Sequence, residues 1–102
     1  EGNIPPFNVD EIHKFLKKVD GWEVLEDKID GFHLLKSFKF ENFLKSQEFV
    51  NKVGEIAETE GHHPDLWFGW GYARIKIYTH AIKGLAESDF ILAAKIDKIS
   101  NA

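Results

Sequence analysis

Hydrophobic and polar residues repeat with two different periods along this chain. In three segments apolar residues recur every three to four positions, which predicts three amphipathic helices. These segments are 8–20, 42–59 and 87–100. In four others apolar and polar residues alternate, which predicts strands. These are 22–26, 32–40, 65–68 and 72–78. Short connections within each pair of strands predict two antiparallel hairpins.

The order of the predicted elements defines a fold class. One helix, two strands, a second helix, two strands and a third helix predict an α+β fold, in which a four-stranded antiparallel sheet carries three helices on one face. The 102 residues are enough for one domain, spanning 1–102. The last helix is apolar on more than one side, since Ile91, Leu92 and Ile99 widen its stripe, which predicts a further subunit against it.

Local signals predict where the helices begin and end. Asn8 and Glu11 have the spacing of a capping box at the start of the first helix, and Gly21 is expected to end it. Gly61 is expected to end the second helix. Gly54 lies inside that helix, where it costs up to ~1 kcal/mol relative to alanine, so we expect a close contact between helix and sheet there.

Composition and charge exclude several classes of protein. Thirteen basic and seventeen acidic residues give a net charge of −4, and no basic stripe is present, so direct nucleic-acid binding is not expected. The absence of cysteine excludes disulfides and thiolate catalysis. The apolar runs are too short to span a membrane. No charged and then apolar leader precedes the domain, so we expect a cytoplasmic location.

The candidate chemistry is concentrated between Glu58 and His80. His62 and His63 follow the end of the second helix, and a strand pair leads back to His80. Histidine can donate or accept a proton at neutral pH, and no serine or cysteine nucleophile lies beside these rings. The pattern therefore favours general acid–base chemistry, such as a dehydration or a tautomerisation. Glu58, four residues before His62, and Asp89 are the candidates for orienting the rings.

Two other interpretations of the histidines remain open at this point. Three histidines and a carboxylate can bind a metal ion, although adjacent residues of an extended chain point apart and the spacing matches no common zinc pattern. The histidines can also be purely structural, because His-His-Pro alone is weakly specific. The two remaining histidines, His13 and His33, are expected to be exposed, the second of them on the open face of the sheet.

Several motifs in this chain form one longer pattern. They are Glu58 followed after three residues by His62-His63-Pro64, then an aromatic-rich strand, Thr79-His80, Gly84-Leu85, and the sequence DFILAAKID from Asp89 to Asp97. Over nearly the whole chain this pattern resembles the pterin-4a-carbinolamine dehydratase family. The resemblance implies a lyase (hydro-lyase) that converts 4a-hydroxytetrahydropterin to quinonoid dihydropterin and water, without metal or cofactor. That activity belongs to tetrahydrobiopterin biosynthesis and recycling.

The resemblance also implies roles for individual residues. His62, His63 and His80 correspond to active-site histidines, with His62 and His80 as base and acid and His63 mainly holding the pterin. Asp89 would orient a histidine. The expected substrate contacts are Glu58, Gly61, His63, Tyr78, Thr79 and Ala81.

Four positions depart from the family pattern, and one of them is Leu66, where tryptophan is common. Gly61 stands where many relatives have aspartate, and Tyr78 stands where a small residue is common, so its ring is expected to crowd the pocket. Ala86 stands where a serine or threonine cap is usual, so Ser88 is expected to cap a shorter last helix.

The expected partners also follow from the resemblance. Relatives pair their sheets edge to edge into homodimers and pack dimers through helices into homotetramers. The substrate is a small pterin. The alternative function is a non-catalytic binding, assembly or coactivator module on the same fold, with a protein partner.

Overall fold

A computed structural model describes residues 4–100, and it contains the predicted elements in the predicted order. The helices are α1 (Val9–Leu16), α2 (Phe43–Glu60) and α3 (Glu87–Ser100). The strands are β1 (Glu23–Asp27), β2 (Gly31–Lys39), β3 (Asp65–Gly69) and β4 (Tyr72–Ile77), and a short 3-10 helix, η1 (His80–Ile82), follows β4. Glu1–Asn3, the start of the N-terminal segment, lie outside the described residues.

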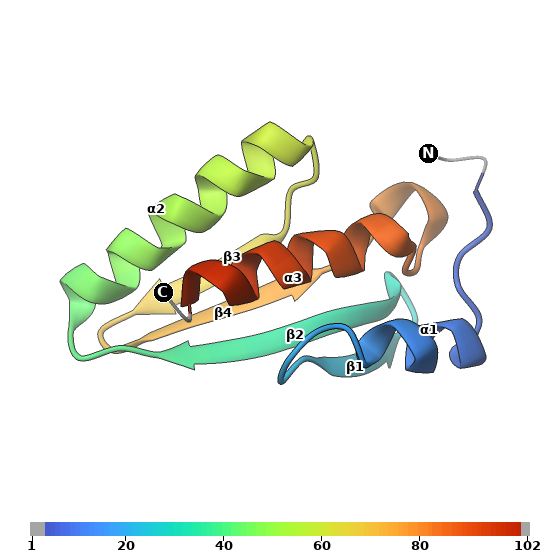
Figure 1. The fold of residues 1–102 in the computed structure, drawn as a ribbon, viewed down its shortest axis with the longest axis horizontal. Coiled ribbons are helices and arrows are strands. Elements are labelled where there is room, and N and C mark those ends of the chain that lie inside the picture. Colours follow the sequence, from blue (N-terminus) through green and yellow to red (C-terminus); the bar gives the residue numbers. More distant parts are fainter. Residues whose placement is uncertain (1–3, 101–102) are drawn as a thin grey trace.

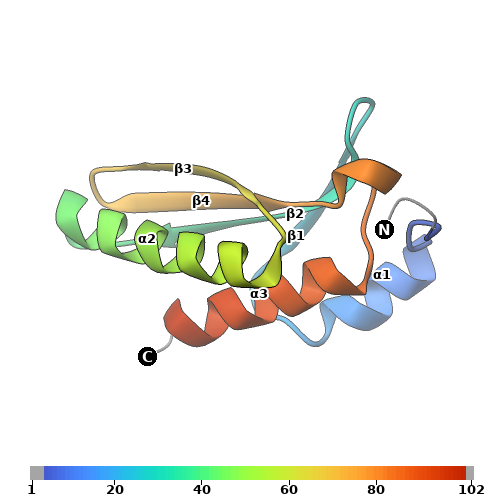
Figure 2. The same cartoon turned by 90° about the horizontal axis from the view of Figure 1, so that it is seen from above.

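The strands form one antiparallel sheet in the order β1-β2-β4-β3. The three helices lie together on one face of this sheet and leave the other face open (Figures 1 and 2). The α+β prediction is therefore confirmed. Within residues 4–100 no helix has the length and apolar character needed to cross a bilayer.

The core lies between the sheet and the helices. Alternate residues of β4 face the helices, and Ala73, Ile75 and Ile77 are fully buried there. Leu34 of β2 lies beside them, since it pairs with Ile77 across the two strands. The residues that close the core from the helix side are Ile12, Phe49, Val53, Ala57, Phe90, Leu92, Ala93 and Ile96.

One charged residue of β2 reaches into the layer between sheet and helices. The Nζ of Lys36 donates a hydrogen bond of 2.8 Å to Asp97 of α3. The carboxylate of Asp97 also accepts the indole N–H of Trp22 and the backbone N–H of Asp20, both at 3.0 Å. These bonds tie the loop after α1 to β2 and α3, and they satisfy a lysine that interrupts the apolar alternation of its strand.

Two predictions about the helices were wrong. The first helix does not extend to Gly21, because α1 ends at Leu16 and the chain tightens there into turns in which Lys18 and Val19 donate to carbonyls three residues back. Gly54 makes no close contact with the sheet. A Cβ built on it would meet nothing within 4 Å, so packing does not explain this helical glycine.

The prediction that His33 is exposed was also wrong, whereas His13 is exposed as expected. His33 is only 7% exposed. Its Nδ1 lies 3.6 Å from a carboxylate oxygen of Asp27, which also lies 3.6 Å from the Nζ of Lys76. The long lysine and its acidic partners cover this end of the open face, which is why a histidine on that face is buried.

Candidate functional site

The end of α2 determines where the histidine pair lies. Gly61 adopts the left-handed conformation, with φ of 65°, which glycine reaches without steric cost. Its N–H donates to the carbonyl of Glu58, and the N–H of His62 donates to that of Ala57 at 3.1 Å. This is a Schellman motif. It confirms Gly61 as the helix terminator, and it turns the chain sharply so that His62 leaves the helix facing α3.

His62 is held by a buried carboxylate. Its Nε2 lies 2.6 Å from Oδ1 of Asp89, a residue that is fully buried. The other oxygen of Asp89 accepts the hydroxyl of Thr79 and the backbone N–H of Ala86, both at 2.8 Å. Because a carboxylate accepts hydrogen bonds, Nε2 carries the proton that points to Asp89, and Nδ1 is the ring nitrogen that does not face this carboxylate. Asp89 thereby fixes the orientation of the His62 ring.

Asp89 also caps the start of α3, which corrects the prediction for Ser88. The helix starts at Glu87 and is not shortened. Asp89 lies in its first turn, and its side chain reaches back to the backbone N–H of Ala86. An acidic residue at the third helical position can make this bond in a capping box. One carboxylate therefore both caps the helix and holds His62.

His63 takes a different partner from its neighbour. Its Nε2 lies 2.7 Å from Oε1 of Glu58, so Glu58, a candidate for orienting the rings, bonds to the ring of His63. The side chains of His63 and Glu58 are 62% and 80% exposed. An ion pair this exposed adds little stability because water screens it. The pair lies at the surface, where it is accessible to a ligand.

The third histidine lies in the loop after β4. Thr79 bridges to Gly84, and the chain between them forms η1, which begins at His80 and includes Ala81. The hydroxyl of Thr79 points to Asp89, whereas the exposed ring of His80 lies 5.8 Å from the ring of Tyr78, measured between centroids. Among the described residues no hydrogen bond holds the His80 ring. Thr79 thus brings His80 to the neighbourhood of the Asp89 group through the backbone.

Lys76 and Asp30, which support the ring of Tyr78, were not identified as site residues from the sequence. The Nζ of Lys76 lies 5.0 Å from the centroid of the Tyr78 ring, and it bonds to Oδ2 of Asp30 at 2.9 Å. The hydrogen bond with Asp30 raises the pKa of Lys76, and partial burial raises the pKa of Tyr78. The signal was present in the sequence, since residues two apart on a strand share a face. The partner Asp30, from the other hairpin, was not apparent.

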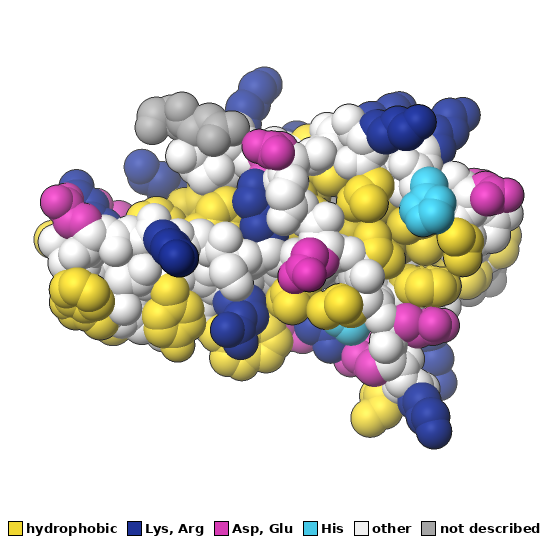
Figure 3. Space-filling model, turned by 90° about the horizontal axis from the view of Figure 1, so that it is seen from below, with side chains coloured by type: hydrophobic (Ala, Val, Ile, Leu, Met, Phe, Trp, Pro, Cys, Tyr) yellow, Lys and Arg dark blue, Asp and Glu magenta, His cyan; other side chains and the backbone are white. Residues whose placement is uncertain are grey.

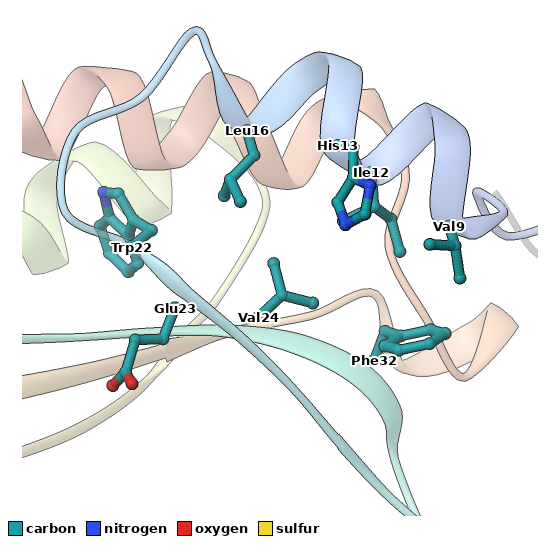
Figure 4. Close-up of a pocket in the computed structure, with 8 residues that line it drawn as sticks. All are labelled: Val9, Ile12, His13, Leu16, Trp22, Glu23, Val24 and Phe32. Atoms are coloured by element: carbon teal, nitrogen blue, oxygen red, sulfur yellow. The ribbon is translucent and has the colours of Figure 1, made fainter.

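The three histidines of the candidate site, His62, His63 and His80, do not line the hollow drawn in Figure 4. That hollow, of about 460 Å³, opens between α1 and the β1–β2 hairpin. It is lined by Val9, Ile12, His13, Leu16, Trp22, Glu23, Val24 and Phe32. None of these is a predicted site residue, and most of them are apolar. We therefore assign the candidate site by its hydrogen-bonded histidines and not by the depth of a cavity. Within residues 4–100 no three histidine or acidic side chains are placed to hold a metal ion.

Known proteins resemble this chain over most of its length. The sequence model of the family described as pterin 4 alpha carbinolamine dehydratase matches residues 5–99. A protein of Rubrobacter xylanophilus, named "Putative pterin-4-alpha-carbinolamine dehydratase", is 48% identical over 99 residues, which are 97% of this chain and 89% of that protein. A protein of Methylococcus capsulatus with the same name is 47% identical over 100 residues, which are 98% of this chain and 85% of that protein. The chain belongs to the pterin 4 alpha carbinolamine dehydratase family.

Two solved structures share the fold. One, described as a transcriptional coactivator/pterin dehydratase from Brucella melitensis, has a TM-score of 0.83 and 26% identity, and the match covers 93% of this chain and 98% of that one. The other is described as a pterin dehydratase-like protein that is a RuBisCO assembly factor in the alpha-carboxysome. It has a TM-score of 0.67 and 22% identity, with 80% and 92% of the two chains covered. At that identity it shows a shared fold only.

Proposed function

We propose that this protein dehydrates 4a-hydroxytetrahydropterin to quinonoid dihydropterin and water by histidine acid–base catalysis. Membership of the dehydratase family supports the reaction class. The observation that carries the proposal is the hydrogen bond between His62 and the buried Asp89, which also accepts the hydroxyl of Thr79 next to His80. A carboxylate that orients a histidine and stabilises its protonated form is the arrangement a general base needs.

The reaction needs one group to take a proton and one to give it. The proton on N5 of the pterin is removed, the N5 electron pair forms a double bond to C4a, and the bond from C4a to the hydroxyl breaks. The hydroxyl leaves as water after it receives a proton. In the proposal Nδ1 of His62 accepts the N5 proton, because Nε2 already donates to Asp89. His80 protonates the hydroxyl, and its exposure lets it regain a proton from solvent.

The remaining predicted residues are assigned to substrate binding. His63 and Glu58 bond to each other at the surface, and both offer polar atoms to the heterocycle of a pterin. Gly61 and Ala81 lie at the two ends of the site, at the turn after α2 and in η1. Gly61 has open space around the position a Cβ would take, so its backbone is accessible from that side. No metal or cofactor takes part in this proposal.

The direct test is the dehydration rate of enzymatically generated 4a-hydroxytetrahydropterin with and without the protein. We expect a rate well above the spontaneous one. We also expect a stable pterin to raise the melting temperature, because a ligand that binds only the native state stabilises it by about 2.7 kcal/mol at one hundred times its Kd. A folded protein that neither accelerates the reaction nor responds to the pterin would contradict the dehydratase proposal.

A second candidate function is a protein-binding or assembly module. The description of the Brucella melitensis structure as a transcriptional coactivator/pterin dehydratase favours it. Large hydrophobic side chains are also exposed around the β3–β4 turn and the start of α2. They are Phe43, Leu44, Trp67, Phe68 and Trp70. In Figure 3 hydrophobic side chains reach the surface at the left end of the molecule, where Figure 1 places that turn. Under this alternative the protein binds a macromolecule and leaves the dehydration rate unchanged.

These exposed side chains also lead to a prediction about assembly. We propose that copies of the chain join edge to edge through β3 and form a homodimer or homotetramer. The reason is that the outer edge of β3 has no neighbouring strand in the sheet and lies beside exposed aromatic residues, which favours association. Sedimentation velocity is expected to show an oligomer. Trp67→Lys on β3 is expected to shift it towards monomer, whereas Leu25→Lys on the opposite edge strand, β1, leaves it unchanged. A wild-type protein that sediments as a clean monomer would refute this assembly.

A further inference from the structure

The three histidines of the candidate site are held in different ways. The ring of His62 bonds to Asp89 and that of His63 to Glu58. The ring of His80 has no hydrogen-bond partner among the described residues. The group beside it is the ring of Tyr78, with centroids 5.8 Å apart and planes inclined by 59°. An exposed histidine without a polar partner would sample several rotamers, so a neighbouring ring has a direct effect on where its nitrogens point.

Tyr78 itself is fixed from the side of the sheet. The ammonium group of Lys76 lies 5.0 Å from the centroid of its ring, within the range of a cation–π contact. That ammonium is held at 2.9 Å by Asp30 and at 3.6 Å by Asp27. The side chain of Lys76 is only 16% exposed, so its position is well defined. Tyr78 is therefore packed against a group that the β1–β2 turn holds in place.

The same turn touches the loop that carries His80. Gly31, next to Asp30, has a positive φ of 74°, and a Cβ built on it would overlap the carbonyl oxygen of Lys83. The β1–β2 turn and η1 lie side by side (Figures 1 and 2). One turn thus contacts the backbone after His80 directly and holds the Lys76 that supports Tyr78. The turn therefore lies against both supports of His80, the backbone that follows it and the Tyr78 ring beside it.

We propose that Tyr78 is a positioning residue for His80, with Lys76 and Asp30 holding the Tyr78 ring in place. The proposal rests on the proposed dehydratase function, in which His80 protonates the leaving hydroxyl. Tyr78 acts through the shape of its ring and does not exchange a proton. Its raised pKa keeps the phenol neutral well above neutral pH, which is consistent with a packing role.

The steady-state test compares three variants. Tyr78→Ala is expected to lower kcat about tenfold with little change in KM, because a catalytic group slightly out of place loses rate. Tyr78→Phe keeps the ring and is expected to retain most of the kcat that Tyr78→Ala loses. Tyr72→Ala, which removes the chain's other tyrosine from the far end of β4, is the matched control and is expected to change neither constant. An unchanged kcat in Tyr78→Ala, or an equal loss in Tyr78→Phe, would overturn the proposal.

A double variant separates positioning from a structural role. If Tyr78 acts through His80, then Tyr78→Ala causes no further loss of rate in the His80→Ala background. Full additivity of the two losses would overturn the proposal. The ring protons of His80, followed by NMR, give a readout that does not depend on activity: they are expected to move in Tyr78→Ala and not in Tyr72→Ala. A folded wild-type protein without activity would overturn the proposed function. If the wild type is active but the His80 signals do not move in Tyr78→Ala, only the positioning role is overturned.

Discussion

His62→Ala is expected to lower kcat for the dehydration by ~10²-fold or more, which is the usual contribution of one general acid–base group. The reason is that the variant removes Nδ1, the atom placed to accept the N5 proton. The fold is expected to persist, because the ring lies at the margin of the core and Asp89 keeps the hydroxyl of Thr79 and the N–H of Ala86. The measurement is kcat and kcat/KM across pH, with the melting temperature recorded for the same samples.

Two further variants show whether the rate loss comes from the hydrogen-bonded group. Asp89→Asn keeps the size of the side chain but offers one oxygen where three donors converge, so at least one donor loses its acceptor. We expect a loss of activity comparable to that of His62→Ala and a lower melting temperature. His63→Ala is the matched control at the neighbouring residue, and it is expected to act mainly on KM. Full activity in both His62→Ala and Asp89→Asn would exclude His62 as the base.

The fold was predictable because its periodic signals are strong and local. The alternation over 72–78 places Ala73, Ile75 and Ile77 on one face, and the structure buries all three. The capping box of Asn8 and Glu11 is also present, with both hydrogen bonds at 2.9 Å. The end of α1 was not predictable in the same way. The apolar stripe continues past Leu16, but loop residues there contact the core without helical geometry.

The site was predictable in its residues and not in its pairings. The sequence places Glu58 four residues before His62 and offers Asp89 as a second candidate partner. It does not show which histidine Asp89 holds, because Asp89 lies 27 residues from His62. The fold decides the choice, because the Schellman turn at Gly61 directs His62 towards α3 and leaves His63 beside Glu58. His33 shows the same limit. Its burial depends on Lys76 and on the acidic turn beside it, and alternation along one strand cannot reveal partners on another.

Asp97→Ala is expected to give a large loss of stability for the substitution of one polar residue. The carboxylate accepts three hydrogen bonds, from Lys36, Trp22 and the backbone of Asp20. The side chains of Lys36 and Asp97 are 16% and 11% exposed. Removing the carboxylate leaves the indole N–H of Trp22 without its acceptor and leaves the ammonium of Lys36 with the carbonyl of Asp20 but no counter-charge. Such a loss costs about 3 kcal/mol.

A competing effect has the opposite sign and is smaller. Asp97 lies in the last turn of α3, where the helix dipole disfavours a negative charge by about 0.3–1 kcal/mol. Its removal therefore regains part of the loss without reversing it. The net expectation is a decrease of about 2 to 3 kcal/mol in the free energy of unfolding, obtained from urea denaturation at constant m-value.

The matched control removes an ion pair of similar length from the surface of the same helix. Lys95 donates to Glu60 at 2.6 Å, with side chains 48% and 27% exposed. Because exposed pairs contribute between about 0 and 1 kcal/mol, Lys95→Ala is expected to cost much less than Asp97→Ala. Equal losses in the two variants would contradict the argument. They would mean that the buried Lys36–Asp97 pair, which links the sheet to α3, contributes no more to the free energy of unfolding than an exposed ion pair does.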